Sequence, residues 1–189
     1  PPEPVPAALP SPSASPSRSP SPEAHLQLGA AVETFFAWNF NRPENGVTAF
    51  RGFDARHNTF ALSNAVLDAR WTAGSVSGRV ALQTGDTPDI YYGSEATSDI
   101  RHVLEATLGW KSAAARGPAL DAGLFLSPIG PEAILVKDNW TWSRSTLFFA
   151  LPFYHSGVRA TLPVTGRTNV TAGLFNGWNS VTDTNGRKS

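Results

Sequence analysis

The sequence has no cysteine and few charged residues for its length. The absence of cysteine excludes disulfides, thiolate chemistry and cysteine-ligated zinc, and it is compatible with an oxidising compartment. Asp, Glu, Lys and Arg make up only 16% of the 189 residues, whereas ordinary soluble proteins have roughly 25%. The chain therefore has few charges for a surface that faces water on all sides.

The charges show no bias of sign, because 15 basic residues balance 15 acidic ones. Nucleic-acid binding needs a concentrated basic face, so we expect no nucleic-acid partner. The sequence also shows no metal-ligand spacing, nucleophile elbow or phosphate loop. His155 and Ser156 are adjacent on a predicted strand and point to opposite faces. We therefore expect no catalytic residue, metal or cofactor, and no enzymatic activity.

Long hydrophobic runs are missing too. A membrane-spanning helix needs about 20 mostly apolar residues. The longest charge-free runs, 145–158 and 168–182, are shorter than that and contain Asn, Gly or Pro. The sequence therefore predicts no membrane-spanning helix.

The first 24 residues differ in composition from the rest. Residues 1–22 hold nine of the 16 prolines and six serines, with almost nothing to bury. Such tracts form extended, polyproline-like spacers. We predict a disordered linker over 1–24 and one folded domain over 25–189.

In the predicted folded part, apolar and polar residues alternate along the chain. In 26–41, Leu28, Val32 and Phe36 are among the even positions, while Gln27 and Glu33 are among the odd ones. A period of two predicts a β-strand whose two faces meet different surroundings. The predicted strands are 26–41, 57–71, 76–83, 100–111, 120–127, 154–162 and 169–179.

The connections between these strands are alternately long and short. Transmembrane barrels of the bacterial outer membrane have long external loops and short periplasmic turns. The pattern therefore predicts an antiparallel up-and-down transmembrane β-barrel with its N-terminus in the periplasm and loops 42–56, 85–99 and 128–146 outside. Aromatic residues gather near strand ends, as an interfacial girdle requires; these are Phe36, Trp38, Phe40, Trp71, Trp110, Tyr154 and Trp178.

The strand 57–71 is ambiguous, because both of its sides carry apolar residues. A charge on the lipid face near mid-membrane costs about 2 to 4 kcal/mol. Asp68 and Arg70 are therefore expected to point inward or to the membrane interface, with the odd positions outward. A β-bulge near Val66 is the alternative.

Several short phrases are more specific than alternation. They are 50–54 (FRGFD), 56–60 (RHNTF), 122–132 (AGLFLSPIGPE), 137–140 (KDNW), 151–155 (LPFYH) and the closing 175–180 (FNGWNS). From about residue 32 to 189 the chain resembles the OmpL-like β-barrel porins of bacterial outer membranes. The resemblance implies a single-domain diffusion pore, usually about twice this length.

The strand count agrees with that implied length. Single-chain bacterial barrels use an even number of strands from about eight upward, and an open sheet edge in lipid leaves backbone groups unpaired. Seven predicted strands therefore indicate a truncated chain, the N-terminal part of a barrel. We expect a porin that lets small hydrophilic solutes diffuse passively through a water-filled barrel, with outer-membrane lipid around it and a homo-oligomer as one option.

Charged residues on the inward sides are the candidate pore-lining groups. They are Glu33, Arg79, Arg101, Glu105, Lys111, Asp121 and Arg159. Such groups set the field that a permeating solute feels, and their mixed signs predict weak selectivity. The alternative is that they pair across neighbouring strands and only keep the lumen wet.

The loop from Ser127 to Ser145 supplies a second set of candidates. They are Glu132, Lys137, Asp138, Trp140 and Trp142. This loop either folds inward and narrows the pore or forms a packed external loop with its own hydrogen bonds. Stacking of the tryptophans on sugars is a less favoured option than anchoring of the loop.

The rival interpretation is a soluble β-sandwich or jelly roll that binds carbohydrate. A sandwich needs charged, solvated residues on its outward faces. Here the side opposite the apolar positions is rich in Gly, Ala, Thr and Asn, as in a crowded lumen, and this favours the pore.

Overall fold

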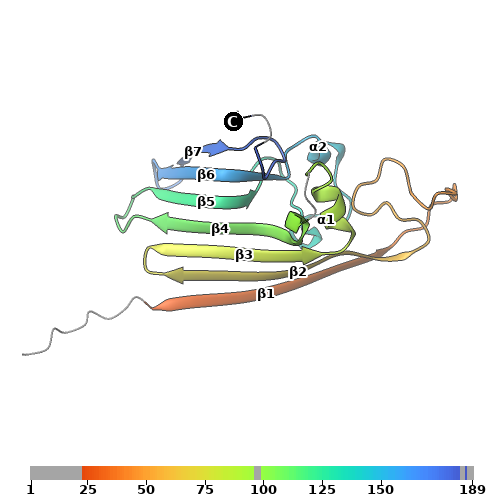
Figure 1. Cartoon of the computed structure of the whole chain (residues 1–189), viewed down its shortest axis with the longest axis horizontal. Helices are drawn as coiled ribbons and strands as arrows, with labels where there is room; N and C mark the ends of the chain where they lie inside the picture. The colour runs from red at the N-terminus through yellow and green to blue at the C-terminus, as the bar shows by residue number, and fades with distance from the viewer. Residues whose placement is uncertain (1–22, 96–98, 184–185, 187–189) are drawn as a thin grey trace, which may run out of the picture.

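The computed structural model of the chain describes residues 23–95, 99–183 and 186. Its strands form one antiparallel sheet in which each strand pairs with the next along the chain (Figure 1). They are β1 (Ala24–Phe36), β2 (Phe60–Ala73), β3 (Val76–Thr84), β4 (Val103–Lys111), β5 (Ala119–Leu126), β6 (Tyr154–Pro163) and β7 (Asn169–Phe175). The predicted all-β, up-and-down architecture is confirmed. The described strands do not form the two packed sheets of a sandwich; β1 and β7 are the edges of a single unclosed sheet.

Short turns join the strands at one end of the sheet and long connections join them at the other (Figure 1). The long connections are 37–59, 85–102 and 127–153, and the last two contain short helical segments. These are α1 (Asp86–Tyr91), η1 (Asp99–His102), η2 (Val136–Asp138) and α2 (Thr146–Phe149). The predicted alternation of long and short connections is therefore present.

Four predicted strand boundaries are wrong by three residues or more. β2 begins at Phe60 rather than at 57. β1 ends at Phe36 rather than at 41, because a turn closes with Arg42 donating its backbone N–H to the carbonyl of Asn39. β7 ends at Phe175 rather than at 179. β4 begins at Val103 rather than at 100, because η1 occupies 99–102.

A β-bulge in β2 resolves the ambiguous strand. Glu33 lies opposite Asn64 and Thr34 opposite Leu62, so Ser63 has no partner on β1. Such an extra residue shifts which positions face each side. The strand therefore has the β-bulge that was the alternative prediction, at Ser63, three residues from the expected Val66.

On the turn side of this bulge the predicted orientation holds. Asp68 and Val66 share a face with Arg79 and Glu33, whereas Leu67 is 66% exposed on the other face. On the loop side the pattern inverts, and Phe60 is 87% exposed. We call the side with Asp68 the polar face and the side with Leu67 the apolar face.

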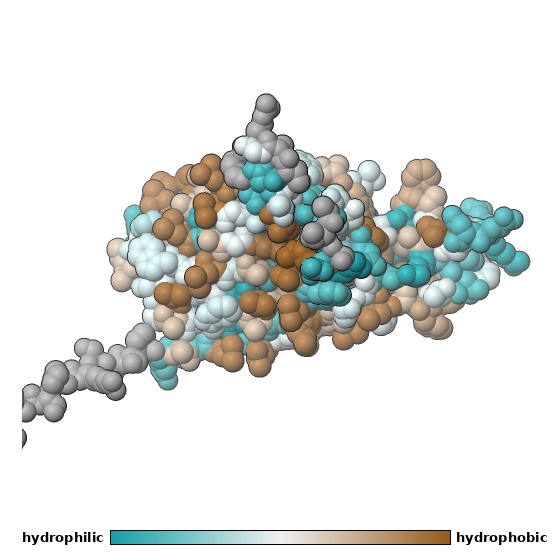
Figure 2. All heavy atoms as spheres, viewed as in Figure 1, coloured by the Kyte–Doolittle hydropathy of each residue, from teal (hydrophilic) through white to brown (hydrophobic). Residues whose placement is uncertain are grey.

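The apolar face is a continuous surface across the strands. One cross-strand row in the register runs through Leu26, Trp71, Gly78, Leu108, Ala122, Val158 and Leu174. Its aliphatic members are exposed, Leu26 at 64% and Leu174 at 63%, while Trp71 is half-buried. Figure 2 shows hydrophobic residues over the strands and hydrophilic ones on the loop that protrudes at the long-connection end. An exposed apolar surface of this extent marks contact with something other than water.

Three residues that alternation assigned to the apolar face are buried instead. A second bulge lies in β4, because Ala81 pairs with Glu105 and Leu82 with Val103. Leu104 therefore has no partner on β3, and its side chain is fully buried. Leu124 and Tyr154 are also buried. The expectation that Tyr154 belongs to an exposed aromatic girdle is wrong, since the long connections pack over it.

The hydrophobic core includes residues of the long connections, which lie at one end of the sheet in Figure 1. It joins strand residues to aromatic and aliphatic side chains of the connections, and its members are Phe53, Val66, Ala81, Tyr91, Tyr92, Leu104, Leu124, Ile134, Leu135, Phe148 and Tyr154. No described helix is long and apolar enough to cross a membrane. The predicted linker, 1–24, lies almost wholly outside the described residues.

Candidate pore interior and loop

An ion-pair network crosses the polar face at the middle of the sheet. Arg79 on β3 donates from Nε to Asp68 Oδ1 at 3.0 Å and from Nη2 to Asp68 Oδ2 at 2.8 Å. Its Nη1 donates to Glu105 on β4, and Arg70 adds a 2.9 Å bond to Asp68. Arg79 therefore joins carboxylates from two neighbouring strands, in a bidentate geometry that lysine cannot reproduce.

A second pair continues this arrangement on the next strands. Arg159 on β6 donates from Nε to Asp121 Oδ2 at 3.1 Å, directly opposite it on β5. The guanidinium of Arg159 also lies over the ring of Phe125, 4.5 Å from its centroid. Asp68, Glu105 and Asp121 balance Arg70, Arg79 and Arg159, so these paired charges sum to zero. The predicted cross-strand pairing of inward charges is present.

We expect Arg79→Gln to make the polar face attract cations over anions. The substitution leaves Asp68 with Arg70 alone and Glu105 without an ion pair within the described residues. The free energy of unfolding should fall by about 2 kcal/mol, because the buried Glu105 carboxylate and the half-buried Asp68 carboxylate lose their charge-assisted bonds to Arg79. The reversal potential in a KCl gradient should shift toward cation selectivity, with a potassium-to-chloride permeability ratio about threefold higher.

Lys111→Gln is the matched control for that prediction. It also removes one positive charge, but Lys111 is exposed at the end of β4 and its side chain makes no recorded contact within the described chain. If both variants shift the reversal potential equally, net charge rather than the ion-pair network determines selectivity.

Other predicted pore-lining residues lie apart from the network. Arg101 lies on η1 rather than on a strand and pairs with Asp89 of α1 at 3.0 Å. Its assignment to the inward side of a strand is therefore wrong, because the strand starts two residues later. Glu33 does lie on the polar face, near the long connections, where it is buried.

Glu33 holds the 127–153 connection against the polar face. Its Oε1 accepts the backbone N–H of Val136 at 2.6 Å. Ile134 and Leu135 of the same connection belong to the core cluster that includes Val66 of β2. The connection that follows β5 thus reaches across the polar face to β1 and β2, at one edge of the sheet.

The same connection also has internal hydrogen bonds of its own. Asn139 Nδ2 donates to the carbonyls of Ala133 and Leu135 at 2.9 and 2.8 Å, and Asn139 Oδ1 accepts from Ala133 N at 2.8 Å. Glu132 accepts from the backbone N–H of Ser145 at 2.9 Å. The hydrogen-bond network of the second option is therefore present, together with the contact to Glu33 on the polar face, while narrowing of a pore by this loop stays a prediction.

The remaining loop candidates are placed as follows. Lys137 and Asp138 pair with each other at 2.7 Å on η2. Trp142 lies beside Phe35 of β1, with ring centroids 6.3 Å apart, and so anchors the loop. Trp140 is fully exposed. Anchoring of the loop therefore holds for Trp142, while stacking of the tryptophans on sugars stays a prediction.

Sequence reasoning missed Arg144, which organises the connection. Its Nε donates to the carbonyl of Ala133 at 3.1 Å, Nη1 to that of Trp142 at 2.5 Å, and Nη2 to that of Ile134. Burial lowers the pKa of the Arg144 guanidinium, opposed chiefly by the negative charge of Glu33. An arginine in a polar loop gives no sequence signal for three carbonyl partners.

A tyrosine cluster was missed as well. Tyr91 and Tyr92 of the 85–102 connection lie 5.1 and 4.8 Å from Tyr154 of β6, measured between ring centroids. Tyr92 Oη donates to the carbonyl of Val103 at 2.6 Å, and Tyr154 Oη donates to Glu95 at 2.8 Å. Burial raises the pKa of Tyr91 and Tyr92, so these hydroxyls stay protonated as donors.

An up-and-down antiparallel sheet with one apolar and one charged face is the architecture of barrel-forming outer-membrane porins. Residues 25–189 match the model of one such family, described as "Putative beta-barrel porin-2, OmpL-like". The chain belongs to this family, which confirms the resemblance of its sequence phrases. Neither the curated proteins nor the solved structures include a match. The family is one of porins, which are generally not enzymes, and it points to the bacterial outer membrane.

Proposed function

We propose that the protein is an outer-membrane pore through which small hydrophilic solutes diffuse passively. The observation that carries the proposal is the contrast between the two faces of one sheet. The apolar face exposes Leu26, Leu67 and Leu174, while the polar face carries the Asp68–Arg79–Glu105 network. In a barrel, an apolar face meets lipid and a charged face meets a water-filled lumen.

The 127–153 connection is proposed to narrow this lumen. It contacts Glu33 and the core residue Val66 on the polar face rather than projecting away from the sheet. The paired charges along the lumen sum to zero, so weak ion selectivity is expected. The short turns and the N-terminus are proposed to face the periplasm and the long connections the exterior, by loop length.

The test uses the full-length protein folded in detergent. A folded barrel should change its gel mobility on boiling and give stepwise conductance in a planar bilayer. Its reversal potential in a KCl gradient should stay close to zero. A monodisperse protein that stays soluble without detergent and gives no conductance steps would contradict the pore. Cross-linking in the same detergent reports whether it forms a homo-oligomer.

A further inference from the structure

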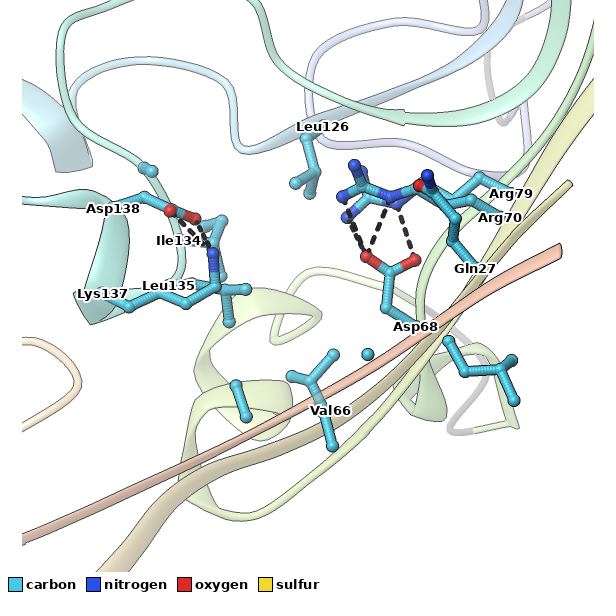
Figure 3. A pocket seen from close by; sticks show the side chains of 15 residues that line it. Gln27, Val66, Asp68, Arg70, Arg79, Leu126, Ile134, Leu135, Lys137 and Asp138 are labelled. Carbon is cyan, nitrogen blue, oxygen red and sulfur yellow. Dashed lines mark hydrogen bonds and ion pairs between the residues drawn. The ribbon is translucent and has the colours of Figure 1, made fainter. Parts of the chain in front are cut away.

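A cavity of about 390 Å³ lies between the polar face of β1 and β2 and the 133–138 segment (Figure 3). Its size is within the range of small-molecule pockets. One wall is the sheet, where Asp68, Arg70 and Arg79 form their ion pairs. The opposite wall is the connection, where Lys137 pairs with Asp138. Each wall therefore presents both signs of charge.

The sheet wall keeps hydrogen-bonding capacity for a solute. Arg70 uses Nε and Nη2 for Asp68, while its Nη1 makes no hydrogen bond within the described part of the chain. The Arg70 side chain is 55% exposed. Gln27 lies directly opposite Arg70 in the strand register, lines the same cavity, and its amide also has no recorded partner among the described residues. A carboxylate here would meet a guanidinium donor and an amide donor together.

The loop wall offers the complementary group. Asp138 is about half exposed, and its only recorded side-chain partner in the described chain is Lys137, the neighbouring residue. Such an exposed adjacent pair is weak, so an ammonium group can share the Asp138 carboxylate. Between the walls the lining is apolar, with Leu126, Ile134 and Leu135.

We propose that this cavity is a subsite for small zwitterions, solutes with one carboxylate and one ammonium group such as amino acids and dipeptides. The proposal rests on the proposed pore and names the solute class that the pore favours. A zwitterion satisfies Arg70 and Gln27 with its carboxylate and Asp138 with its ammonium group. An anion or a cation of the same size gains only one of these contacts and meets the like charge on the opposite wall. A neutral solute gains no charge-assisted bond.

The experiment is solute block of single-channel current through the full-length protein. Dialanine is compared with N-propionylalanine, dialaninamide and N-propionylalaninamide, which are the anionic, cationic and neutral counterparts of similar size. Dialanine should interrupt the current at a half-saturating concentration about tenfold lower than any of the other three. Arg70→Gln and Asp138→Asn, on opposite walls, should each raise that concentration about fivefold. Arg167→Gln, in the exposed β6–β7 turn, should leave it unchanged.

The outcomes separate this proposal from the pore itself. Normal conductance with equal block by all four solutes overturns the zwitterion subsite and leaves the pore intact. Equal sensitivity of Arg167→Gln and Arg70→Gln also overturns it, because block would then follow net charge. Complete absence of conductance from a protein that shows the mobility shift on boiling overturns the pore, and the subsite with it.

Discussion

Gly123→Ala is expected to prevent the central strands from pairing in their native register. Gly123 has a φ of +134°, and a β-carbon there would lie 2.1 Å from the backbone oxygen of Ala106 on β4. Directly opposite, a β-carbon on Gly157 would lie 2.0 Å from the backbone oxygen of Leu174 on β7. Backbone atoms of paired strands cannot move away without breaking the ladder between them.

The expected loss in the free energy of unfolding is about 3 kcal/mol or more, since strain at a special φ and overpacking against backbone act together. Denaturant unfolding in detergent, followed by tryptophan fluorescence and gel mobility, measures it. Gly166→Ala is the control, because Gly166 lies in the β6–β7 turn with nothing within 4 Å of its β-carbon position. A Gly123→Ala protein that unfolds at the wild-type denaturant concentration would show that these strands tolerate a side chain.

The regular strands could be predicted because alternation is a local signal. β3 occupies 76–84 against a predicted 76–83, and β5 occupies 119–126 against 120–127. The pairing of Asp121 with Arg159 could also be predicted, because both residues occupy inward-facing positions on neighbouring strands. These features depend only on residue order and on the two-residue repeat.

The positions of the two bulges and the partner of the long loop could not be predicted in the same way. The extra residues Ser63 and Leu104 carry no compositional signature, and each bulge is defined by the pairing of two strands. The contact from Glu33 to Val136 joins residues 103 positions apart. A glutamate on a strand can equally face water or a neighbouring charge. Only the folded position of the 127–153 connection shows that the partner of Glu33 is the backbone N–H of Val136.

Arg144→Met is expected to release the 127–153 connection from the polar face. The substitution keeps a long apolar stem but leaves the carbonyls of Ile134 and Trp142 without their donor, while the carbonyl of Ala133 keeps its bond from Asn139 Nδ2. Each unsatisfied buried carbonyl costs about 1 to 3 kcal/mol, and contact of the guanidinium with the ring of Phe53, 5.5 Å from its centroid, is lost as well. The connection should therefore loosen while the sheet stays paired, because Arg144 contacts no strand residue through a recorded hydrogen bond.

Two measurements separate the loosening of the loop from its effect on the pore. Trypsin should cleave after Lys137, already exposed on η2, much faster in Arg144→Met than in wild type, since cleavage needs local opening of the backbone. If the connection narrows the lumen, single-channel conductance should rise about twofold in the same variant. Arg116→Met, in the exposed β4–β5 turn, should change neither. Faster cleavage with unchanged conductance would show that Arg144 holds the loop in place but that the loop does not narrow the ion path. Unchanged cleavage would show that the three carbonyl bonds do not hold the loop.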